Sequence, residues 1–451
     1  RGLRGVLGAS RPQQVLVVLE NNAELRGTGG IVTVFAKATA RDGRLKVDAF
    51  QDVDSVADLA PQVRRVPAPP DFHRLYGGFL ADTTLWKNTN MDPDIPTSSQ
   101  VLANVATVSL GRRPDAVLWL DVPTIAAVLR ATGPVRLPDG TELTAENAVT
   151  RLLSTAYRDA PNTADGQGQR RAALRSAADA VLGDLLGSGT SAPSPVALAR
   201  ELFTAARGRH LALWSDHAAV QRDLASSGLD GAVRAGSGDV SSFAVHNLGG
   251  GDTDGNKLDF YGRRHVTVQV AVTRDHAEVS QEVSLRNTAP ARGLPIYVSG
   301  RVTPGVANSF ITMALPSGAL DVVFSRSGRR IVTSPLPSGD HEVVTDIASL
   351  PPGTMTTWTL RYRLPLTTGH YQLALVPQPL AVDAGLSLTM RSLGGDELLA
   401  PGLDRGPDGE LARSGGFTEA VEVDATLERP GLLRRTARAL SHFWSEPVSL
   451  G

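Results

Sequence analysis

Residues 14–30 of the chain read QVLVVLENNAELRGTGG, and this stretch decides the fold of the N-terminal half. Its first part, residues 14–20, is a short, continuous and valine-rich apolar run, which is typical of a strand buried on both faces. A polar segment from residue 20 to residue 26 follows at once, and glycines come next at positions 27, 29 and 30. Because ligands in open α/β sheets bind beyond the carboxyl ends of strands, we expect five side chains here to belong to a functional site. They are Glu20, Asn21, Asn22, Glu24 and Arg26. The alternative is a hydrogen-bonded turn in which Arg26 pairs with Glu24.

Strand and helix patterns alternate outward from this stretch. A second apolar run covers residues 31–38, and the Asp42-Gly43 pair before residues 45–50 is a strong hairpin signal. Helical spacing covers residues 98–110, 123–130, 170–186 and 196–207, with a further helix from residue 144 and a buried strand at 116–120. This alternation predicts a layered α/β domain over residues 1–250.

The pattern changes to period two from residue 258 to residue 429. Strands are expected at 265–273, 278–286, 354–364, 371–376, 386–391 and 419–427, separated by Gly, Pro and Asp. Such a series predicts an antiparallel β-sandwich as the second domain. Residues 430–451 are expected to form a basic C-terminal helix or tail.

The composition excludes several classes of function. Lys and Arg (45) almost balance Asp and Glu (46), so no basic face for nucleic acid is expected. The absence of cysteine excludes disulfides, thiol nucleophiles and cysteine-based metal sites. No phosphate-binding loop, dinucleotide-binding glycine motif, nucleophile elbow or H-E-x-x-H motif occurs. The chain begins at Arg1 rather than Met, so we expect that an N-terminal anchor or signal segment has been removed.

Asp52 and Asp54 end the second pair of expected strands. Carboxylates at positions i and i+2 point to the same side of an extended segment. They could hold Mg²⁺ or supply a general base, or they could belong to a solvated loop.

Two further groups complete the candidate site. The loop of residues 86–96 places an aromatic ring beside amides and carboxylates, a combination that suits carbohydrate. Its candidate substrate-binding residues are Trp86, Asn88, Asn90, Asp92 and Asp94, although either aspartate could simply cap a turn. Arg170, Arg171 and Arg175 are expected at a helix start, where Arg170 and Arg171 could bind an anion, or they could lie on a solvated helix face.

Several of these segments resemble one family. Residues 15–30, VLVVLENNAELRGTGG, resemble the hallmark of bacterial envelope proteins classed as domain of unknown function 4012. Residues 88–96, residues 115–135, and Asn247 with residues 257–261 resemble later segments of the same family. The resemblance implies an extracytoplasmic protein of the cell envelope, or a secreted one, that is membrane-anchored in its full-length form.

The order of elements is also distantly similar to the LytR-CpsA-Psr phosphotransferases, which move lipid-pyrophosphate-linked glycopolymers onto the cell wall. This similarity implies that Arg26 and Arg170 or Arg171 bind a pyrophosphate, and that Asp52 matches a metal-binding aspartate. The chain departs from that pattern at two positions, because Thr28 and Gln51 stand where an aspartate and an arginine are expected.

Three functions remain open. The first is a glycopolymer transferase in which Arg26, Arg170 and Arg171 bind pyrophosphate while Asp52 and Asp54 bind Mg²⁺ or act as base. The second is a glycoside hydrolase or transglycosylase of an envelope polysaccharide such as an arabinan. Its acid and nucleophile would be two of the carboxyl groups of Glu20, Glu24, Asp52, Asp54, Asp92 and Asp94. The third is a non-catalytic module that binds or assembles envelope glycan, without a perturbed carboxylate. All three name cell-wall polysaccharide or lipid-linked glycan as the partner.

Overall fold

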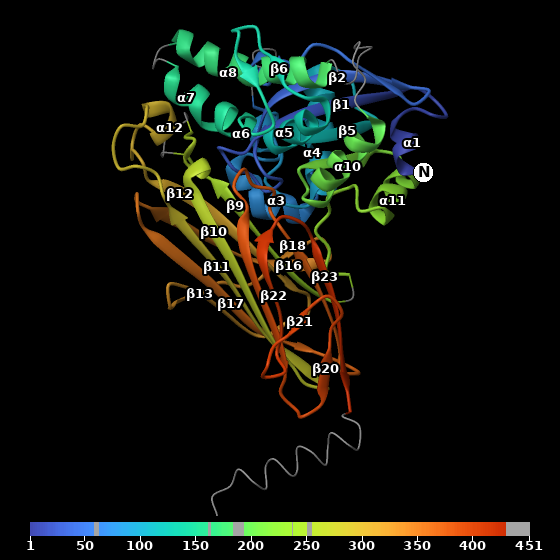
Figure 1. Ribbon diagram of the computed structural model, residues 1–451, viewed down its shortest axis with the longest axis vertical. Helices are drawn as coiled ribbons and strands as arrows, with labels where there is room; N and C mark the ends of the chain where they lie inside the picture. The colour runs from blue at the N-terminus through green and yellow to red at the C-terminus, as the bar shows by residue number, and fades with distance from the viewer. Residues whose placement is uncertain (58–62, 161–163, 184–193, 237, 250–254, 430–451) are drawn as a thin grey trace, which may run out of the picture.

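The computed structural model describes residues 1–451 with the exception of 58–62, 161–163, 184–193, 237, 250–254 and 430–451. The expected basic C-terminal helix therefore lies outside the described residues. The helix-rich part of the chain occupies one end of the molecule, and long strands form the other end (Figure 1). The first part is an α/β domain and the second is rich in mostly antiparallel strands, as the sequence predicts at this level.

A mixed sheet organises the α/β domain, and the valine-rich run is its central strand. That strand, β1 (Gln13–Asn21), pairs antiparallel with β2 (Ile31–Arg41) and parallel with β5 (Ala116–Asp121). The strand order is β3-β2-β1-β5-β8, with β3 at Arg44–Val47 and β8 at Leu211–Ser215, while β4 (Gln51–Asp52) pairs with β2. The Asp42-Gly43 turn joins β2 to β3 with both residues at positive φ (51° and 80°), which confirms the expected hairpin.

Helices cover both faces of this sheet, as the continuous apolar pattern of β1 requires. Val15, Val17 and Leu19 pack in one core cluster with α5 (Val122–Thr132), whereas Leu16 and Val18 pack in another with α4 (Ile95–Leu110). Other helices of this domain are α1 (Gly2–Val6), α3 (Pro70–Tyr76), α6 (Ala148–Thr150), α7 (Ala156–Asp159), α8 (Ala164–Ala178), α10 (Pro195–Arg207) and α11 (Ala218–Ser226). Short elements complete it: α2 (Asp54–Ala57), η1 (Gly77–Phe79), η2 (Trp86–Asn88), η3 (Arg151–Thr155), η4 (Asp179–Gly183), β6 (Val135–Arg136) and β7 (Glu142–Leu143).

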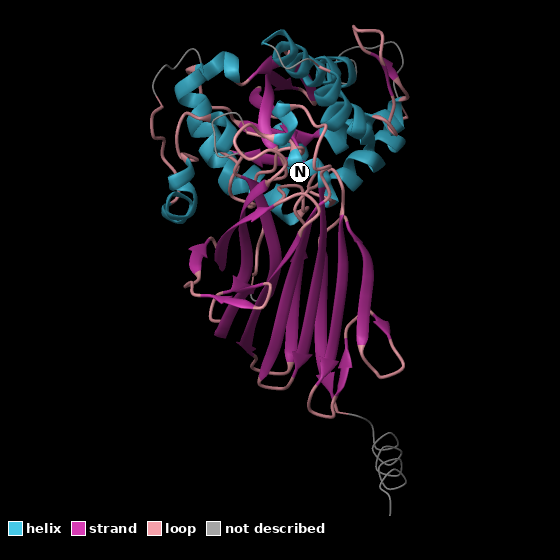
Figure 2. Cartoon of the chain, turned by 90° about the vertical axis from the view of Figure 1, so that its left-hand side faces the viewer, coloured by secondary structure: helices cyan, strands magenta, loops and turns pink. Residues whose placement is uncertain are grey.

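Two large sheets make up the β-rich part, and their strands run along the length of the molecule (Figure 2). The eight-stranded sheet has the order β14-β13-β17-β11-β10-β19-β22-β21. Its strands are β10 (Gly262–Val272), β11 (His276–Asn287), β13 (Leu320–Arg326), β14 (Arg329–Ile331), β17 (Met355–Pro365), β19 (Ala384–Ser392), β21 (Asp404–Arg405) and β22 (Leu411–Phe417).

The seven-stranded sheet has the order β15-β16-β12-β9-β18-β23-β20. Its strands are β9 (Asp239–Asn247), β12 (Ala307–Pro316), β15 (Leu336–Ser338), β16 (His341–Leu350), β18 (His370–Val376), β20 (Glu397–Leu399) and β23 (Val421–Glu428). Strand β9 precedes residue 258, where the sequence analysis places the start of the second domain. The helical elements η5 (Leu258–Tyr261) and α12 (Ile296–Ser299) lie between strands.

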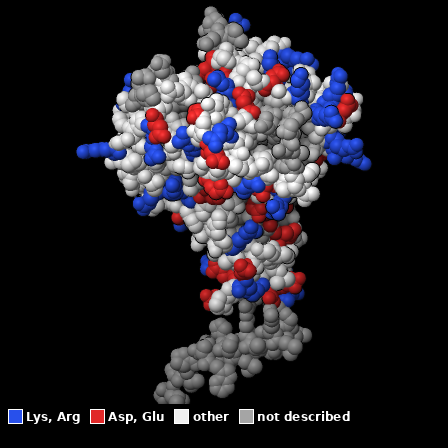
Figure 3. Space-filling model, turned by 45° about the horizontal axis from the view of Figure 1, so that its top comes forward, with Lys and Arg blue, Asp and Glu red and all other residues white. Residues whose placement is uncertain are grey.

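One shared hydrophobic core joins the two sheets, with members such as Val245 from β9, Val268 from β10 and Leu373 from β18. The sandwich is not wholly antiparallel, because β10 pairs parallel with β19 and β9 pairs parallel with β18. Acidic and basic side chains are interspersed over the face of the molecule seen in Figure 3, in line with the net charge of −1. Among the described residues, no helix combines the length and the apolar character that a membrane crossing requires.

Candidate functional site

A cavity of about 450 Å³ lies where the α/β domain meets the β-rich part. Its lining residues come from the ends of β1 and β2, from β4 and α2, from the loop before α4, from α7, and from the segments around Asn247, Lys257 and Tyr297. Its volume falls in the range of about 300–1,000 Å³ that is usual for small-molecule sites. The carboxyl end of β1 therefore borders a cavity, as the sequence analysis expects of a ligand site.

A buried ion-pair cluster forms the polar part of this cavity. The Glu24 carboxylate accepts hydrogen bonds from Lys257 Nζ and, at 3.4 Å, from an Arg26 guanidinium nitrogen. Arg26 also donates from Nε to Asn88 Oδ1 at 3.0 Å and from Nη1 to the Leu25 and Asn247 carbonyls. All of these contacts lie in the interior, since Glu24, Arg26 and Lys257 are at most 7% exposed.

The charges of this cluster stabilise one another against the cost of burial. Burial alone would raise the pKa of Glu24, but Lys257 and Arg26 outweigh it and lower the pKa. Burial likewise disfavours the charged form of Lys257, and Glu24 reverses this effect and raises the lysine pKa. Glu24 and Lys257 are therefore both charged at neutral pH. An ionised Glu24 cannot serve as a general acid, and a protonated Lys257 cannot serve as a nucleophile.

Two tyrosines flank the lysine. The rings of Tyr157 and Tyr297 stack with centroids 5.8 Å apart, and Lys257 Nζ lies 5.8 Å and 5.3 Å from the respective centroids. Asn21 donates from Nδ2 to the Tyr157 hydroxyl, and its own Oδ1 accepts from the backbone N–H of Ala23 at 3.0 Å. Asn21 is thus a lining residue whose amide is fixed by its neighbours.

Asp52 and Asp54 both line the cavity, but each already has a cationic partner. Arg175 Nη1 lies 3.0 Å from Asp52 Oδ2, and Lys87 Nζ lies 2.6 Å from Asp54 Oδ1. Strand β4 ends at Asp52 and helix α2 begins at Asp54, so the extended geometry expected for an i, i+2 pair is interrupted. Within the described part of the chain, no group of three or more His, Asp or Glu side chains could hold a metal ion. These residues do not fit a Mg²⁺ site.

The cavity also has an apolar wall, which the sequence analysis does not anticipate. Eight apolar side chains line it: Ile31, Val34, Val53, Phe79, Leu85, Met91, Leu174 and Leu248. Thr33 lies beside them, and its buried Oγ1 has no hydrogen-bond partner among the described residues. The site therefore combines a charged wall, an apolar wall and one free hydroxyl.

Glu20 precedes the lining residue Asn21 in the chain, but its own side chain does not line the cavity. Its Oε1 accepts hydrogen bonds from the Thr28 hydroxyl and, at 2.8 Å, from Asn90 Nδ2, which also donates to the Gly30 carbonyl at 2.6 Å. Burial raises the pKa of Glu20 to about 8, and the Asp121 charge adds to the shift. Glu20 and Asn90 thus form a closed network that fixes the turn after β1.

Other expected site residues also have structural partners. Asn22 donates to Asp121 Oδ2 at 3.0 Å inside the protein. Asp92 is buried and accepts from the Asp94 N–H at 2.8 Å, while Asp94 caps α4 by accepting from the Thr97 N–H at 3.0 Å. This arrangement matches the turn-capping alternative for the two aspartates.

Trp86 does not offer an exposed ring for a sugar. It is 3% exposed, packs against Phe35 with centroids 5.0 Å apart, and donates from Nε1 to Ser109 Oγ at 3.2 Å. Arg170 and Arg171 are expected at a helix start, but they lie in the middle of α8, which begins at Ala164, so the helix N-terminus is not beside them. Their side chains lie outside the described part of the structure.

The expected site residues that do meet at the cavity are Asn21, Glu24, Arg26, Asp52, Asp54 and Asn88. Sequence reasoning misses Lys87, Tyr157, Lys257 and Tyr297, which line the cavity. Arg175, expected beside Arg170 and Arg171, pairs with the lining residue Asp52. Only the resemblance of residues 257–261 to a family segment gives any signal for Lys257.

Solved structures offer only weak likenesses. A candidate nutrient binding protein from Legionella pneumophila has a TM-score of 0.28 and 6% identity, over 47% of this chain and 78% of its own. The protein gbs0355 from Streptococcus agalactiae has a TM-score of 0.30 and 10% identity, over 50% of this chain and 76% of its own. An M1 zinc metallopeptidase from Deinococcus radiodurans has a TM-score of 0.23 and 13% identity, over 37% of this chain and 42% of its own. TM-scores this low do not establish a shared fold or function.

No curated protein matches the sequence. The similarity to the LytR-CpsA-Psr phosphotransferases stays a prediction. Residues 10–157 match the family model described as "Protein of unknown function (DUF4012)". This match confirms the family resemblance for the segment that supplies β1, Glu24, Arg26, Asp52, Asp54 and Tyr157.

Proposed function

We propose that the protein is an extracytoplasmic cell-envelope transferase that binds a lipid-pyrophosphate-linked glycan in this cavity and passes the glycan to the cell wall. The main support for the proposal is that the cavity is lined by both cationic and apolar side chains. Three cationic side chains, Arg26, Lys87 and Lys257, line it together with eight apolar side chains. A lipid-linked glycan needs both, because its chain is apolar while its pyrophosphate is recognised by guanidinium and ammonium groups.

The transfer can be written with its atoms balanced. An acceptor hydroxyl on the wall polymer attacks the phosphorus that carries the glycan, forming a new P–O bond. The bond from that phosphorus to the bridging oxygen breaks, and the lipid leaves as its monophosphate with the electron pair. The hydroxyl proton passes to Asp54, which lines the cavity beside Lys87. Arg26 and Lys257 stabilise the charge on the phosphoryl oxygens, which is the main protein contribution in phosphoryl transfer.

A second function, glycan binding without transfer, has its own supporting observation. The three cations of the lining are balanced by Glu24, Asp52 and Asp54, and each cation contacts a carboxylate or an amide already. A neutral polyhydroxylated ligand suits such a compensated surface. A glycoside hydrolase has less support, because the two candidate carboxyl groups whose pKa burial raises, Glu20 and Asp92, are outside the cavity lining.

The test combines a lipid-pyrophosphate oligosaccharide with fractionated envelope polysaccharide and scores the products by mass spectrometry. Transfer predicts release of lipid monophosphate together with a matching mass gain on the acceptor, both lost in Lys257→Met. The matched control is Arg130→Met, which removes a cation paired with Glu201 at 2.8 Å outside the cavity. Ligand retention without products would favour the binding function, and released sugar with the pyrophosphate intact would favour the hydrolase. Absence of both binding and turnover would refute the proposal for this ligand.

A further inference from the structure

A second hollow, of about 600 Å³, lies on the β-rich part and is formed by neighbouring strands of the eight-stranded sheet. Side chains alternate along these strands, so that Val268 and Leu360 face the shared core while Gln269 and Arg361 are exposed. The hollow is therefore on the outer face of the sheet. It is separate from the cavity described above, because the two share no lining residue.

The strand register sets two rows of outward side chains across this hollow. In one row Thr389, Gln269, Ser280 and Arg361 follow one another from β19 through β10 and β11 to β17. In the next row Ala271 and Glu278 lie between Arg391 on β19 and Arg363 on β17. The middle of the hollow is thus formed by short or uncharged side chains and one carboxylate, while arginines stand on both sides.

Two of these arginine side chains lack a partner among the residues that the structure describes. Arg363 pairs with Asp321 at 3.1 Å, whereas the side chains of Arg361 and Arg391 have no ion pair or hydrogen bond within the described part of the chain. Three strand spacings separate β17 from β19, which places the two backbones about 14 Å apart. A free guanidinium is suited to a planar carboxylate, which it can bind through two parallel hydrogen bonds.

The side chains between the arginines point to the rest of the ligand. Thr389 and Ser280 offer hydroxyls, Gln269 offers an amide, and Glu278 offers an acceptor for hydroxyl groups. Glu278 and Glu410 in the same hollow disfavour a ligand with phosphates throughout, such as a nucleic acid. An oligomer with spaced carboxylates and many hydroxyls supplies anions for the two arginines and hydroxyl groups for the polar side chains between them.

We propose that this hollow binds an acidic oligosaccharide in an extended conformation across the strands. Two of its carboxylates pair with Arg361 and Arg391, and its hydroxyls contact Gln269, Ser280, Thr389 and Glu278. The β-rich part is then a glycan-binding surface in its own right, beyond the transfer function proposed for the cavity.

The test is calorimetric titration of the full chain with a hyaluronan oligosaccharide, in which carboxylate-bearing and neutral sugars alternate, using a neutral malto-oligosaccharide of equal length as comparison. We expect binding of the acidic oligomer only, weakened at least tenfold in the Arg361→Ala/Arg391→Ala variant. The matched control is Arg329→Ala/Arg330→Ala, which removes the same charge from the exposed strand β14 of the same sheet. Equal loss in the control, equal affinity for the neutral oligomer, or no binding at all would overturn the proposal.

Two additional variants separate this surface from the cavity. Glu278→Gln removes the carboxylate between the arginines, so affinity for the acidic oligomer is expected to rise by about threefold. Lys257→Met should leave this binding unchanged, since Lys257 belongs to the other cavity. A fall in affinity in Glu278→Gln would contradict the placement of the ligand.

Discussion

Glu20 is a buried acid whose protonation is coupled to folding. Burial raises its pKa to about 8 from 4.5, so the folded chain binds this proton more tightly than the unfolded chain. The contribution of Glu20 to the free energy of unfolding is thus fully present below pH 4.5 and falls by about 1.4 kcal/mol per pH unit until about pH 8. In Glu20→Gln, which mimics the protonated acid, we expect the slope measured by urea denaturation between pH 6 and 8 to become shallower by about that amount. Asp42→Asn, at an exposed turn, should keep the slope.

The Glu24–Lys257 pair gives a second prediction at the scale of single residues. Glu24→Gln leaves two buried cations, Arg26 and Lys257, without the carboxylate that they share. Breaking a buried pair from one side costs about 3–5 kcal/mol, because an uncompensated charge remains in the interior. The double variant Glu24→Gln/Lys257→Met removes one of these two cations and is expected to recover part of that loss in chemical denaturation. If the double variant is as unstable as the single one, charge compensation is not what stabilises this site.

At the scale of elements, the turn after β1 packs directly on the loop before α4. A Cβ on Gly27 would lie 2.2 Å from the Met91 carbonyl oxygen and 2.6 Å from the Asp92 carbonyl carbon. Backbone atoms cannot move aside as a flexible side chain can, so Gly27→Ala should destabilise the protein by about 1–3 kcal/mol. The control is Gly78→Ala, where a Cβ would meet no atom within 4 Å. Equal thermal unfolding temperatures for both variants would contradict this close approach.

The same elements show what local sequence can predict. The run of residues 14–20 is recognisable as a doubly buried strand because its pattern is continuous, and β1 is covered on both faces. The loop of residues 86–96 is misleading, because a Trp and two Asp have the same composition whether they face a ligand or the interior. Trp86 completes a core, and Asp94 caps α4. Lys257 lies 233 residues from Glu24 in the chain, so no local pattern could have paired them.

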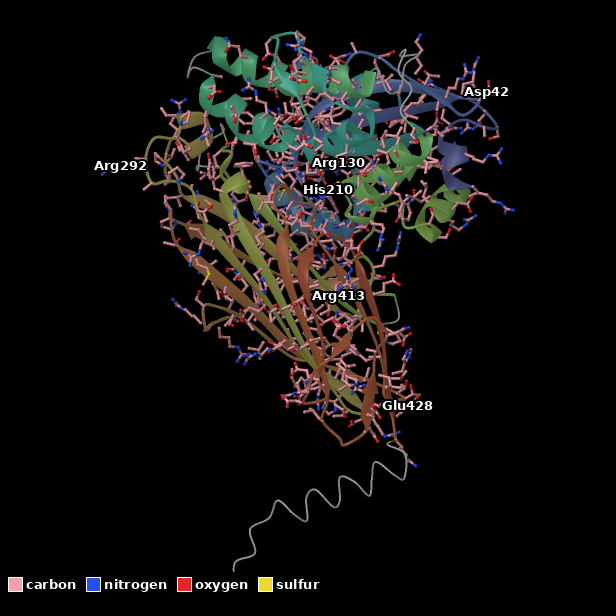
Figure 4. The ribbon with its side chains drawn as sticks, in the orientation of Figure 1. Asp42, Arg130, His210, Arg292, Arg413 and Glu428 are labelled. Atoms are coloured by element: carbon pink, nitrogen blue, oxygen red, sulfur yellow. The ribbon has the colours of Figure 1, made fainter. Side chains whose placement is uncertain are left out.

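At the scale of the whole molecule, one buried arginine links the α/β domain to the β-rich part. The guanidinium of Arg209 donates to the Pro93 carbonyl before α4, to the Gly231 carbonyl at 2.8 Å before β9, and to the Pro377 carbonyl at 2.7 Å after β18. His210, the next residue, pairs with Asp121 at 2.6 Å and lies where the two parts meet (Figure 4). The cavity depends on this junction, since its lining comes from both sides.

The last prediction follows from that junction. Arg209→Met leaves three buried carbonyls without their donor, and each unsatisfied group costs about 1–3 kcal/mol. Because those carbonyls belong to both parts, we expect the two parts to unfold separately in urea rather than together. Three buried tryptophans, Trp86, Trp119 and Trp214, make fluorescence report mainly the α/β domain, with Trp358 of β17 as the contribution from the β-rich part. Far-ultraviolet circular dichroism reports the strands of the β-rich part as well.

The control is Arg207→Met, which removes a half-exposed ion pair of 2.7 Å with Glu419 across the same junction. Exposed pairs contribute about 0–1 kcal/mol, so its two transitions should still coincide. Coincident transitions in Arg209→Met as well would mean that the wider packed interface, rather than this guanidinium, couples the two parts. Separate transitions would identify Arg209 as the residue that couples the folding of the cavity to that of the β-rich part.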